Sequence, residues 1–498
     1  MLFPLPLREG ARGRGTSSAY SENSFAAPSL LRPDGRVSEG EERAGSAEAA
    51  EGLPVPRRYW AHLAIAVTVT MAVMDGSIAN VALPTIARDL GTTSAAIIWV
   101  VNAYQLAICV SLLVLGSLGD IHGYHRVYRA CIVIFIVASL GCAFSPSLLA
   151  LSTARFFQGL GGAGILGVSN AIVRTIYPRK ELPIGIGRNA LVVAIALVAG
   201  PSLASAILAV ASWPWLFAVN VPLGLAALAI GARVLPRTEG SGHAFDAVSA
   251  ALNVLAFGGL VLGIEGFGHG DRSLATVLEG LVGVLAMVML VRRQRAVRSP
   301  LLPLDLLRIR LFALSVSTTF LASMAQIMAY VAIPFLFQER LGLTQVQTGL
   351  LITPWPVMVG LVAPVAGRLA QRFSAGLLSS LGLAILSVGL LLLAGLAPGA
   401  GTADIVWRML VAGLGYGIFL PPNSSTVLAA APRERSGGAS SMAGTARVLG
   451  QAIGSAAVAL LFGLAPEHGS AWALATGAGI ALLGVAISAA RSARLAAS

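Results

Sequence analysis

Long apolar segments alternate with short polar ones along most of the chain. From about residue 60 onward, windows of about 20 apolar residues recur, and each is closed by a few polar, glycine or arginine positions. A helix of about 20 residues crosses the ~30 Å hydrocarbon core of a bilayer. Strands of a membrane barrel would alternate apolar and polar residues, and these segments do not. The pattern therefore predicts an all-α polytopic membrane protein.

We count fourteen such segments, an even number that places both chain ends on one side of the membrane. Twenty-two Lys and Arg residues flank the segment ends on the side of the N-terminus, whereas three flank the other ends. Positive charge accumulates in cytoplasmic loops, so this side is predicted to be the cytoplasm. The predicted spans are 60–83, 97–118, 127–145, 148–172, 186–210, 214–233, 246–266, 275–291, 311–337, 348–370, 375–396, 404–429, 437–463 and 470–490.

Composition excludes several classes of protein. Hydrophobic residues make up 56% of the 498 residues and charged residues 11%, against about 25% charged residues in soluble domains. The net charge of +12 lies in loops between spans, so nucleic acid is not an expected partner. Cys109, Cys131 and Cys142 fall inside predicted spans without paired spacing, which argues against disulfides or a metal site. Nucleophile, dinucleotide and zinc motifs are absent, so we expect neither an enzyme nor a cofactor.

A weak internal repeat divides the chain. The stretch Gly116–Asp120 is echoed by Gly367–Gln371, and the glycine-rich stretch 159–165 by 413–418. We predict a disordered tail over 1–56, a six-helix bundle over 57–235, two inserted helices with a basic connector over 236–310, and a second six-helix bundle over 311–498. The tail has no signal-peptide core. The connector, Arg292 to Arg310, is expected to lie along the membrane. Repeats of this kind place a binding site between the halves, near the midplane.

A polar hinge separates the second and third spans. Its pattern, Gly116-x-Leu-Gly-Asp120-x-x-Gly123-x-x-Arg126, resembles the cytoplasmic signature loop of the major facilitator superfamily. It departs from that signature at Ile121 and Tyr124. The resemblance implies two bundles and a gating loop in which Asp120 and Arg126 form a charge cluster. A plain charge-bearing turn is the alternative interpretation.

Two charged residues lie deep in predicted spans. The stretch around Asp75, through Asn80 to Pro84, resembles the first-helix signature of the fourteen-span drug:proton antiporter branch of this superfamily. Burial favours the protonated form of a carboxylate, and a charge in hydrocarbon is a functional hypothesis by default. Arg155, followed by Gln158-Gly159, resembles the family's proton-transfer motif. Both lie ~10–12 Å from the outer ends of their predicted spans. We expect Arg155 to set the protonation of Asp75; a static packing pair or cap is the alternative.

Span five carries Gly187 and Gly200-Pro201, which resemble the motif of antiporters in this superfamily, although Ala196, Ala204 and Ser205 stand where glycine is usual. Gly200-Pro201 is expected to break its helix. Prolines at 354, 356, 421 and 422 are expected to break spans ten and twelve, and broken helices tend to line cavities. Predicted substrate-cavity residues, with packing as the alternative for each, are Asn80, Tyr104, Gln158, Gln326, Tyr330, Trp355 and Asn423.

The resemblance spans about residues 57–495 and is greatest to proteins that confer resistance to methyl viologen and quaternary ammonium compounds. It implies a multidrug efflux antiporter of the bacterial inner membrane that exports lipophilic cations by alternating access, with the proton gradient as energy source. Its partners would be the bilayer, cationic amphiphiles and protons, and we expect a monomer. Two other classes stay open: a facilitative or proton-coupled carrier of another small metabolite, and a membrane sensor or scaffold.

Overall fold

The computed structural model describes residues 52–178, 181–238, 240, 245–268, 273–294, 304–432 and 436–495. All regular secondary structure within these ranges is helical, and fourteen helical segments are long and apolar enough to cross a membrane. The predicted all-α class and the fourteen spans are confirmed. Most of the predicted tail and residues 295–303 of the predicted connector lie outside the described residues.

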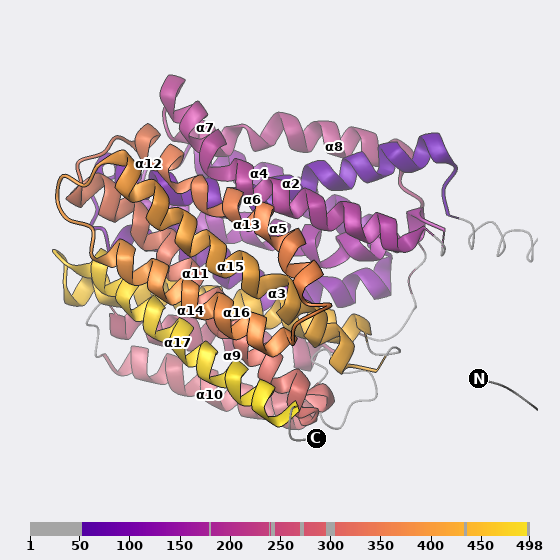
Figure 1. The fold of residues 1–498 in the computed structure, drawn as a ribbon. Helices are drawn as coiled ribbons and strands as arrows, with labels where there is room; N and C mark the ends of the chain where they lie inside the picture. The colour runs from indigo at the N-terminus through magenta and orange to yellow at the C-terminus, as the bar shows by residue number, and fades with distance from the viewer. Residues whose placement is uncertain are drawn as a thin grey trace, which may run out of the picture. The chain divides into compact units, whose positions relative to one another are not determined.

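The first seven helices pack mainly with one another and are called the N-terminal group (indigo to magenta in Figure 1). They are α2 (Val55–Asp89), α3 (Trp99–His122) with the 3₁₀ turn η1 (Ala96–Ile98) before it, α4 (Tyr124–Ala143), α5 (Leu148–Ile176), α6 (Leu182–Val210), α7 (Pro214–Ala218) and α8 (Asn220–Val234). Two further helices, α9 (Ala247–Gly268) and α10 (Leu274–Gln294), pack on each other, and α9 also contacts α3 and α16.

The remaining helices form the C-terminal group. They are α11 (Arg310–Phe335), which follows η2 (Leu304–Arg308), the π-helical turn η3 (Leu336–Arg340), α12 (Gln345–Ile352), α13 (Pro354–Leu369), α14 (Ala375–Ala394), α15 (Thr402–Ala430), α16 (Ser436–Leu464) and α17 (Gly469–Leu495).

The two groups repeat one packing scheme. The contacts α2–α6, α2–α8, α3–α5, α4–α5 and α4–α8 in the N-terminal group correspond to α11–α16, α11–α17, α13–α15, α14–α15 and α14–α17 in the C-terminal group. Helices α9 and α10 have no counterpart in this scheme. The weak sequence repeat therefore has an equivalent in three dimensions.

Prolines interrupt fewer helices than the sequence suggests. Span ten is divided at Thr353, between α12 and α13. By contrast, α6 continues through Pro201 and α15 through Pro421 and Pro422, so the predicted breaks there are wrong. The first span also continues past its predicted end at residue 83. Pro84 lies buried inside α2, which runs on to Asp89. Membrane helices tolerate proline where neighbouring helices and side chains satisfy the freed backbone groups.

One residue, Gly123, joins α3 to α4. Its φ of +91° is the conformation that glycine adopts most easily. A Cβ at this position would collide with the backbone of Thr238, whose hydroxyl accepts a hydrogen bond from the backbone N–H of His125 at 3.1 Å. The predicted polar hinge is thus a sharp corner that is packed against the segment after α8.

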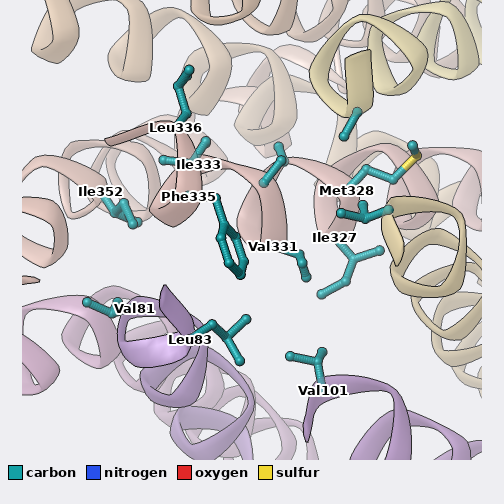
Figure 2. Close-up of a cluster of buried hydrophobic side chains, with 14 of the residues drawn as sticks. Val81, Leu83, Val101, Ile327, Met328, Val331, Ile333, Phe335, Leu336 and Ile352 are labelled. Atoms are coloured by element: carbon teal, nitrogen blue, oxygen red, sulfur yellow. The ribbon is translucent and has the colours of Figure 1, made fainter. Parts of the chain in front are cut away.

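A buried apolar cluster connects the two groups. Figure 2 shows Val81 and Leu83 of α2 and Val101 of α3 facing Val331 and Phe335 of α11. Hydrogen bonds accompany this contact: Gln338 Nε2 donates to the carbonyl of Val81 at 2.8 Å, and Ser94 Oγ donates to Glu339 at 2.8 Å. The groups are therefore joined at the end of the bundle where α2 terminates.

Candidate functional site

An ion pair lies between α2 and α5 in the N-terminal group. Arg155 Nη1 contacts Asp75 Oδ2, and the side chains of Arg155 and Asp75 are only 1% and 2% exposed. Asp75 is fourteen residues from the end of α2 at Asp89, or ~21 Å at 1.5 Å per residue. It is therefore deeper than the sequence suggests, because α2 is longer than the predicted span.

The other carboxylate oxygen of Asp75 is also occupied. Oδ1 accepts hydrogen bonds from Gln158 Nε2 at 2.9 Å and from Asn220 Nδ2 at 3.0 Å. Gln158 donates in addition to Ser139 Oγ at 2.9 Å, which fixes its amide. Side chains of α5 and α8 therefore hold both carboxylate oxygens of Asp75 in place.

Arg155 is held from three sides besides Asp75. Its Nε donates to the carbonyl of Val100 at 3.0 Å, and Nη1 donates to Gln158 Oε1 at 2.7 Å. The guanidinium carbon lies 4.2 Å from the ring centroid of Tyr104, within the range of a cation–π contact. Tyr104 is itself held by a 2.8 Å hydrogen bond from its hydroxyl to the carbonyl of Ala72.

Glycines in α5 allow this arrangement. A Cβ on Gly159 would lie 2.5 Å from the carbonyl oxygen of Tyr104, and one on Gly161 would lie 2.7 Å from the backbone of Cys131 and Phe135. Small residues let membrane helices approach this closely. The glycine run therefore brings α5 against α3 and α4, so that Arg155 and Gln158 reach Asp75.

The pair can act as a two-state element. In a medium of low dielectric, two opposite charges in contact hold each other strongly, and removal of one leaves the other buried and uncompensated. If Asp75 takes up a proton, Arg155 loses its charge partner and the hydrogen bonds from Gln158 and Asn220 weaken. A proton on Asp75 would thus loosen the contacts of α2 with α5 and α8.

The hinge residues do not form the predicted charge cluster. Asp120 is exposed and its carboxylate accepts a hydrogen bond from the hydroxyl of Tyr124, one turn ahead. None of the four ion pairs found in the described ranges includes Asp120 or Arg126. A Cβ on Gly116 would meet open space. The packed corner at Gly123 turns Tyr124, rather than Arg126, towards Asp120.

The predicted antiporter motif is part of α6. There, α6 contacts α2 of its own group and also the C-terminal group. A Cβ on Gly200 would collide with Ser77 Oγ of α2. The carbonyl of Pro201 lies against Gly349 of α12 in the other group, while Ser202 Oγ and Thr353 Oγ1 are 2.9 Å apart. Gly187 has open space around its Cβ position.

The predicted cavity residues lie in several separate places. Tyr104 and Gln158 belong to the ion-pair network described above. Asn80 is buried on α2, and its Oδ1 has no hydrogen-bond partner in the described structure. Tyr330 and Trp355 pack together, with ring centroids 5.3 Å apart. The sequence thus identified separate clusters rather than one lining.

Asn423 belongs to a polar cluster around Arg491. Arg491 Nη1 donates to Asn423 Oδ1 at 2.9 Å and to Ser315 Oγ at 2.8 Å, and Asn423 Nδ2 donates to Thr319 Oγ1 at 2.8 Å. Thr319 begins a polar stripe along one face of α11, at helical spacing. Its members are Thr319, Ser323, Gln326 and Tyr330.

Sequence reasoning assigned no role to several of these residues. Asn220 and Ser139, which complete the Asp75 network, carry the weak signal of a polar side chain within an apolar segment. Arg408 precedes the second glycine-rich stretch, 413–418, much as Arg155 precedes the first, but it pairs with Asp404 one turn before it, at 2.9 Å. The repeat in sequence therefore does not carry the buried ion pair into the second group.

A cavity of about 270 Å³ opens near the joined end of the bundle. Its lining includes Ser94, Glu339, Arg340 and Glu467, and none of the predicted cavity residues. It therefore does not reach Asp75 or the stripe on α11.

Comparison with known proteins places the chain in a family. Residues 65–455 match the family described as Major Facilitator Superfamily. The chain is 47% identical over 441 residues to the uncharacterized transporter YebQ of Escherichia coli strain K12, which covers 88% of this chain and 96% of that protein. It is 29% identical to the multidrug efflux pump LfrA of Mycolicibacterium smegmatis, covering 87% of this chain and 90% of that protein.

Two further similarities add to this. The chain is 28% identical to the riboflavin transporter RibZ of Clostridioides difficile, over 79% of this chain and 85% of that protein. A crystal structure of a peptide transporter POT in complex with sulfate superposes with a TM-score of 0.69 at 15% identity, over 91% of this chain and 98% of that one. That likeness concerns the fold alone. The chain belongs to the major facilitator superfamily and is a multi-pass membrane transporter.

Proposed function

We propose that this member of the major facilitator superfamily is a proton-coupled efflux antiporter for amphipathic organic compounds. The observation that carries the proposal is the Asp75–Arg155 pair, a titratable group inside the membrane with a charge partner that depends on its protonation. Intramembrane carboxylates of this kind mark proton pathways. The multidrug pump LfrA among its relatives supports an efflux function.

The proposed cycle is alternating access. The N-terminal and C-terminal groups rock about a site between them, and residues 57–235 and 311–498 act as the two moving bundles. With the N-terminus in the cytoplasm, the contacts that Gln338 and Ser94 make between the groups would lie on the outer side and would have to open there during the cycle. A proton that enters from outside neutralises Asp75, frees Arg155 and so changes which state is favoured.

Lipophilic cations such as methyl viologen are the substrates that the sequence resemblance implies. A free carboxylate in the site would attract such a cation. Both oxygens of Asp75 are occupied in this structure, by Arg155, Gln158 and Asn220. A cation would therefore meet Asp75 only after Arg155 has moved away.

The proposal is tested with purified protein in proteoliposomes. Accumulation of two cations, ethidium and methyl viologen, and of one anion, 2-naphthoate, is followed with an imposed proton gradient and again after an uncoupler. Gradient-dependent accumulation of at least one compound, abolished by the uncoupler, supports the proposal. Accumulation that is independent of the gradient contradicts it.

A carrier of a small metabolite is the second candidate. The observation that favours it is the similarity to a protein described as a riboflavin transporter, at an identity close to that of the multidrug pump. Transport of riboflavin in the same proteoliposomes without proton counterflow would favour this candidate over antiport.

A further inference from the structure

Arg447 is a charged residue inside a membrane-spanning helix to which the proposed coupling mechanism gives no role. It lies nine residues after the start of the span Gly438–Leu464 in α16, or ~14 Å along the helix. Its side chain is exposed. None of the four ion pairs in the described part of the chain includes it.

The face of α16 that carries Arg447 points towards the N-terminal group. Residues three and four apart share a helix face, so Gly444, Arg447 and Gln451 lie on one side. Gln451 is 3.5 Å from Gln105 of α3, across the interface between the groups. One turn before Arg447, a Cβ on Gly444 would meet open space. Arg447 is therefore exposed next to open space, beside a contact between the two groups.

The surroundings of Arg447 contain hydrogen-bond donors and aromatic rings. Tyr416 of α15 lies close enough to Arg447 for the two side chains to interact electrostatically. The Tyr416 hydroxyl also shares a hydrogen bond with the side chain of Ser323 on the α11 stripe. Two turns further along that stripe, Tyr330 packs against Trp355. Aromatic side chains supply the apolar contact area typical of small-molecule sites.

Among Asp75, Arg155 and Arg447, three charged side chains within the spans, the net charge is positive. Asp75, a buried carboxylate of α2, pairs with Arg155. Arg447 has no ion-pair partner among the residues that the structure describes. A guanidinium within a membrane faces the bundle interior or an aqueous cavity and marks a substrate pathway by default. Its planar fork matches a carboxylate or another oxyanion in two parallel hydrogen bonds.

We propose that Arg447 anchors an oxyanion of the substrate, and that the exported compounds are amphipathic organic anions with an aromatic or apolar body. This inference rests on the proposed efflux function and narrows its substrate class away from lipophilic cations. The anion binds Arg447 from the open space beside it, while the body of the substrate lies along the stripe of α11 towards Tyr330.

The test uses two probes that differ in charge alone. Binding of 2-naphthoate and of its neutral counterpart 2-naphthamide is measured with the purified full-length protein in detergent. We expect wild type to prefer the carboxylate and Arg447→Gln to bind it about tenfold or more weakly, as expected for loss of a hydrogen bond to a charged group. Arg447→Lys keeps the charge without the fork and should lose part of this affinity.

The matched control is Arg408→Gln. Arg408 is also an arginine in a membrane helix of the C-terminal group, but it already pairs with Asp404, so its removal should leave the affinity for naphthoate unchanged. The inference is overturned if wild type shows no preference for naphthoate over naphthamide, or if Arg447→Gln keeps that preference.

The design separates this inference from the proposed function. If Arg447→Gln loses naphthoate binding, while Asp75→Asn binds naphthoate like wild type but loses gradient-driven transport, both hold. If Arg447→Gln leaves naphthoate binding unchanged while Asp75→Asn abolishes gradient-driven transport, the antiporter stands and the anion anchor fails. If Asp75→Asn transports normally while Arg447→Gln loses binding, the anchor stands and the coupling mechanism fails.

Discussion

Arg155 and Asp75 contact each other inside the membrane although eighty residues separate them in sequence. Their contact ties α5 to α2, and the donors Gln158 and Asn220 bring α8 into the same network. A buried pair of this kind contributes little net stability but is costly to break. That asymmetry suits a switch, because the pair stays closed until a proton removes one of its charges.

Arg155→Lys tests whether the geometry of the pair matters beyond its charge. A lysine cannot at once contact Asp75, donate to the carbonyl of Val100 and lie over the ring of Tyr104. We expect gradient-driven transport to fall about tenfold or more, since 1.36 kcal/mol in a barrier is tenfold in rate, and its pH profile to shift. The measurement is the initial rate between pH 5 and 9. An unchanged pH profile would count against a coupling role for Arg155.

Asn220→Ala removes one hydrogen bond to Asp75 Oδ1. Because that bond helps to hold the carboxylate in place beside Arg155, its loss should lower gradient-driven transport about tenfold or more, as expected for a hydrogen bond to a charged group. Asn253→Ala is the control, since Asn253 is also buried but donates to the carbonyl of Val110. An equal fall in the initial rate of transport in both variants would contradict the assignment.

Gly161→Ala should destabilise the protein by about 1–3 kcal/mol. The added Cβ would lie 2.7 Å from backbone atoms of Cys131 and Phe135, so α5 must move away from α4. Gly258→Ala in α9 is the control, because its Cβ would meet open space. The melting temperature in detergent should fall for the first variant and stay or rise slightly for the second; equal values would show that the close approach is unimportant.

Gln338→Ala should loosen the joined end of the bundle. Gln338 donates to the carbonyl of Val81 and accepts from Thr85 and Arg88, so it connects the two groups. Spin labels at Thr93 and Glu467 should then report a new, longer distance between the groups. In the control Gln347→Ala, which loses contacts with Thr344 alone, the distance should be that of wild type. No change in Gln338→Ala would contradict the gating role of this contact.

Asp246, which precedes α9, forms an ion pair with Arg293 in the last turn of α10, at 2.9 Å. Partial burial by itself would raise the pKa of Asp246, but hydrogen bonds from Ser249 and Arg293 lower this pKa to about 2. A depressed folded-state pKa gives stability above the unfolded value near 3.8, which is lost as the pH falls towards 2. Asp246→Asn should therefore cost about 1 kcal/mol, equally at pH 5 and pH 8. A cost that differs between these two pH values would contradict this.

The ion pair and the number of spans could be predicted from sequence for physical reasons. Long apolar runs permit few alternatives to membrane helices, and a lone carboxylate within such a run needs a partner. Asp75 and Arg155 were each the exceptional charge of an apolar segment. The partners Asn220 and Ser139 could not be predicted, because their position depends on how the glycines of α5 let the helices approach.

The predictions that the structure contradicts failed for a common reason. Proline weakens an isolated helix, which predicts breaks at Pro201, Pro421 and Pro422, but α6 and α15 continue through them in the packed bundle. The corner at Gly123 likewise turns Tyr124 rather than Arg126 towards Asp120. In each case the neighbouring helices, which a local pattern does not contain, decide the outcome.

The most direct test of the account compares two kinds of transport by Asp75→Asn in proteoliposomes. Asparagine cannot be ionised, so the variant should still exchange substrate for substrate across the membrane at a rate near that of wild type. It should no longer accumulate substrate against its gradient when a proton gradient is imposed. Gradient-driven accumulation by Asp75→Asn at the wild-type rate would contradict the claim that this carboxylate couples protons to transport.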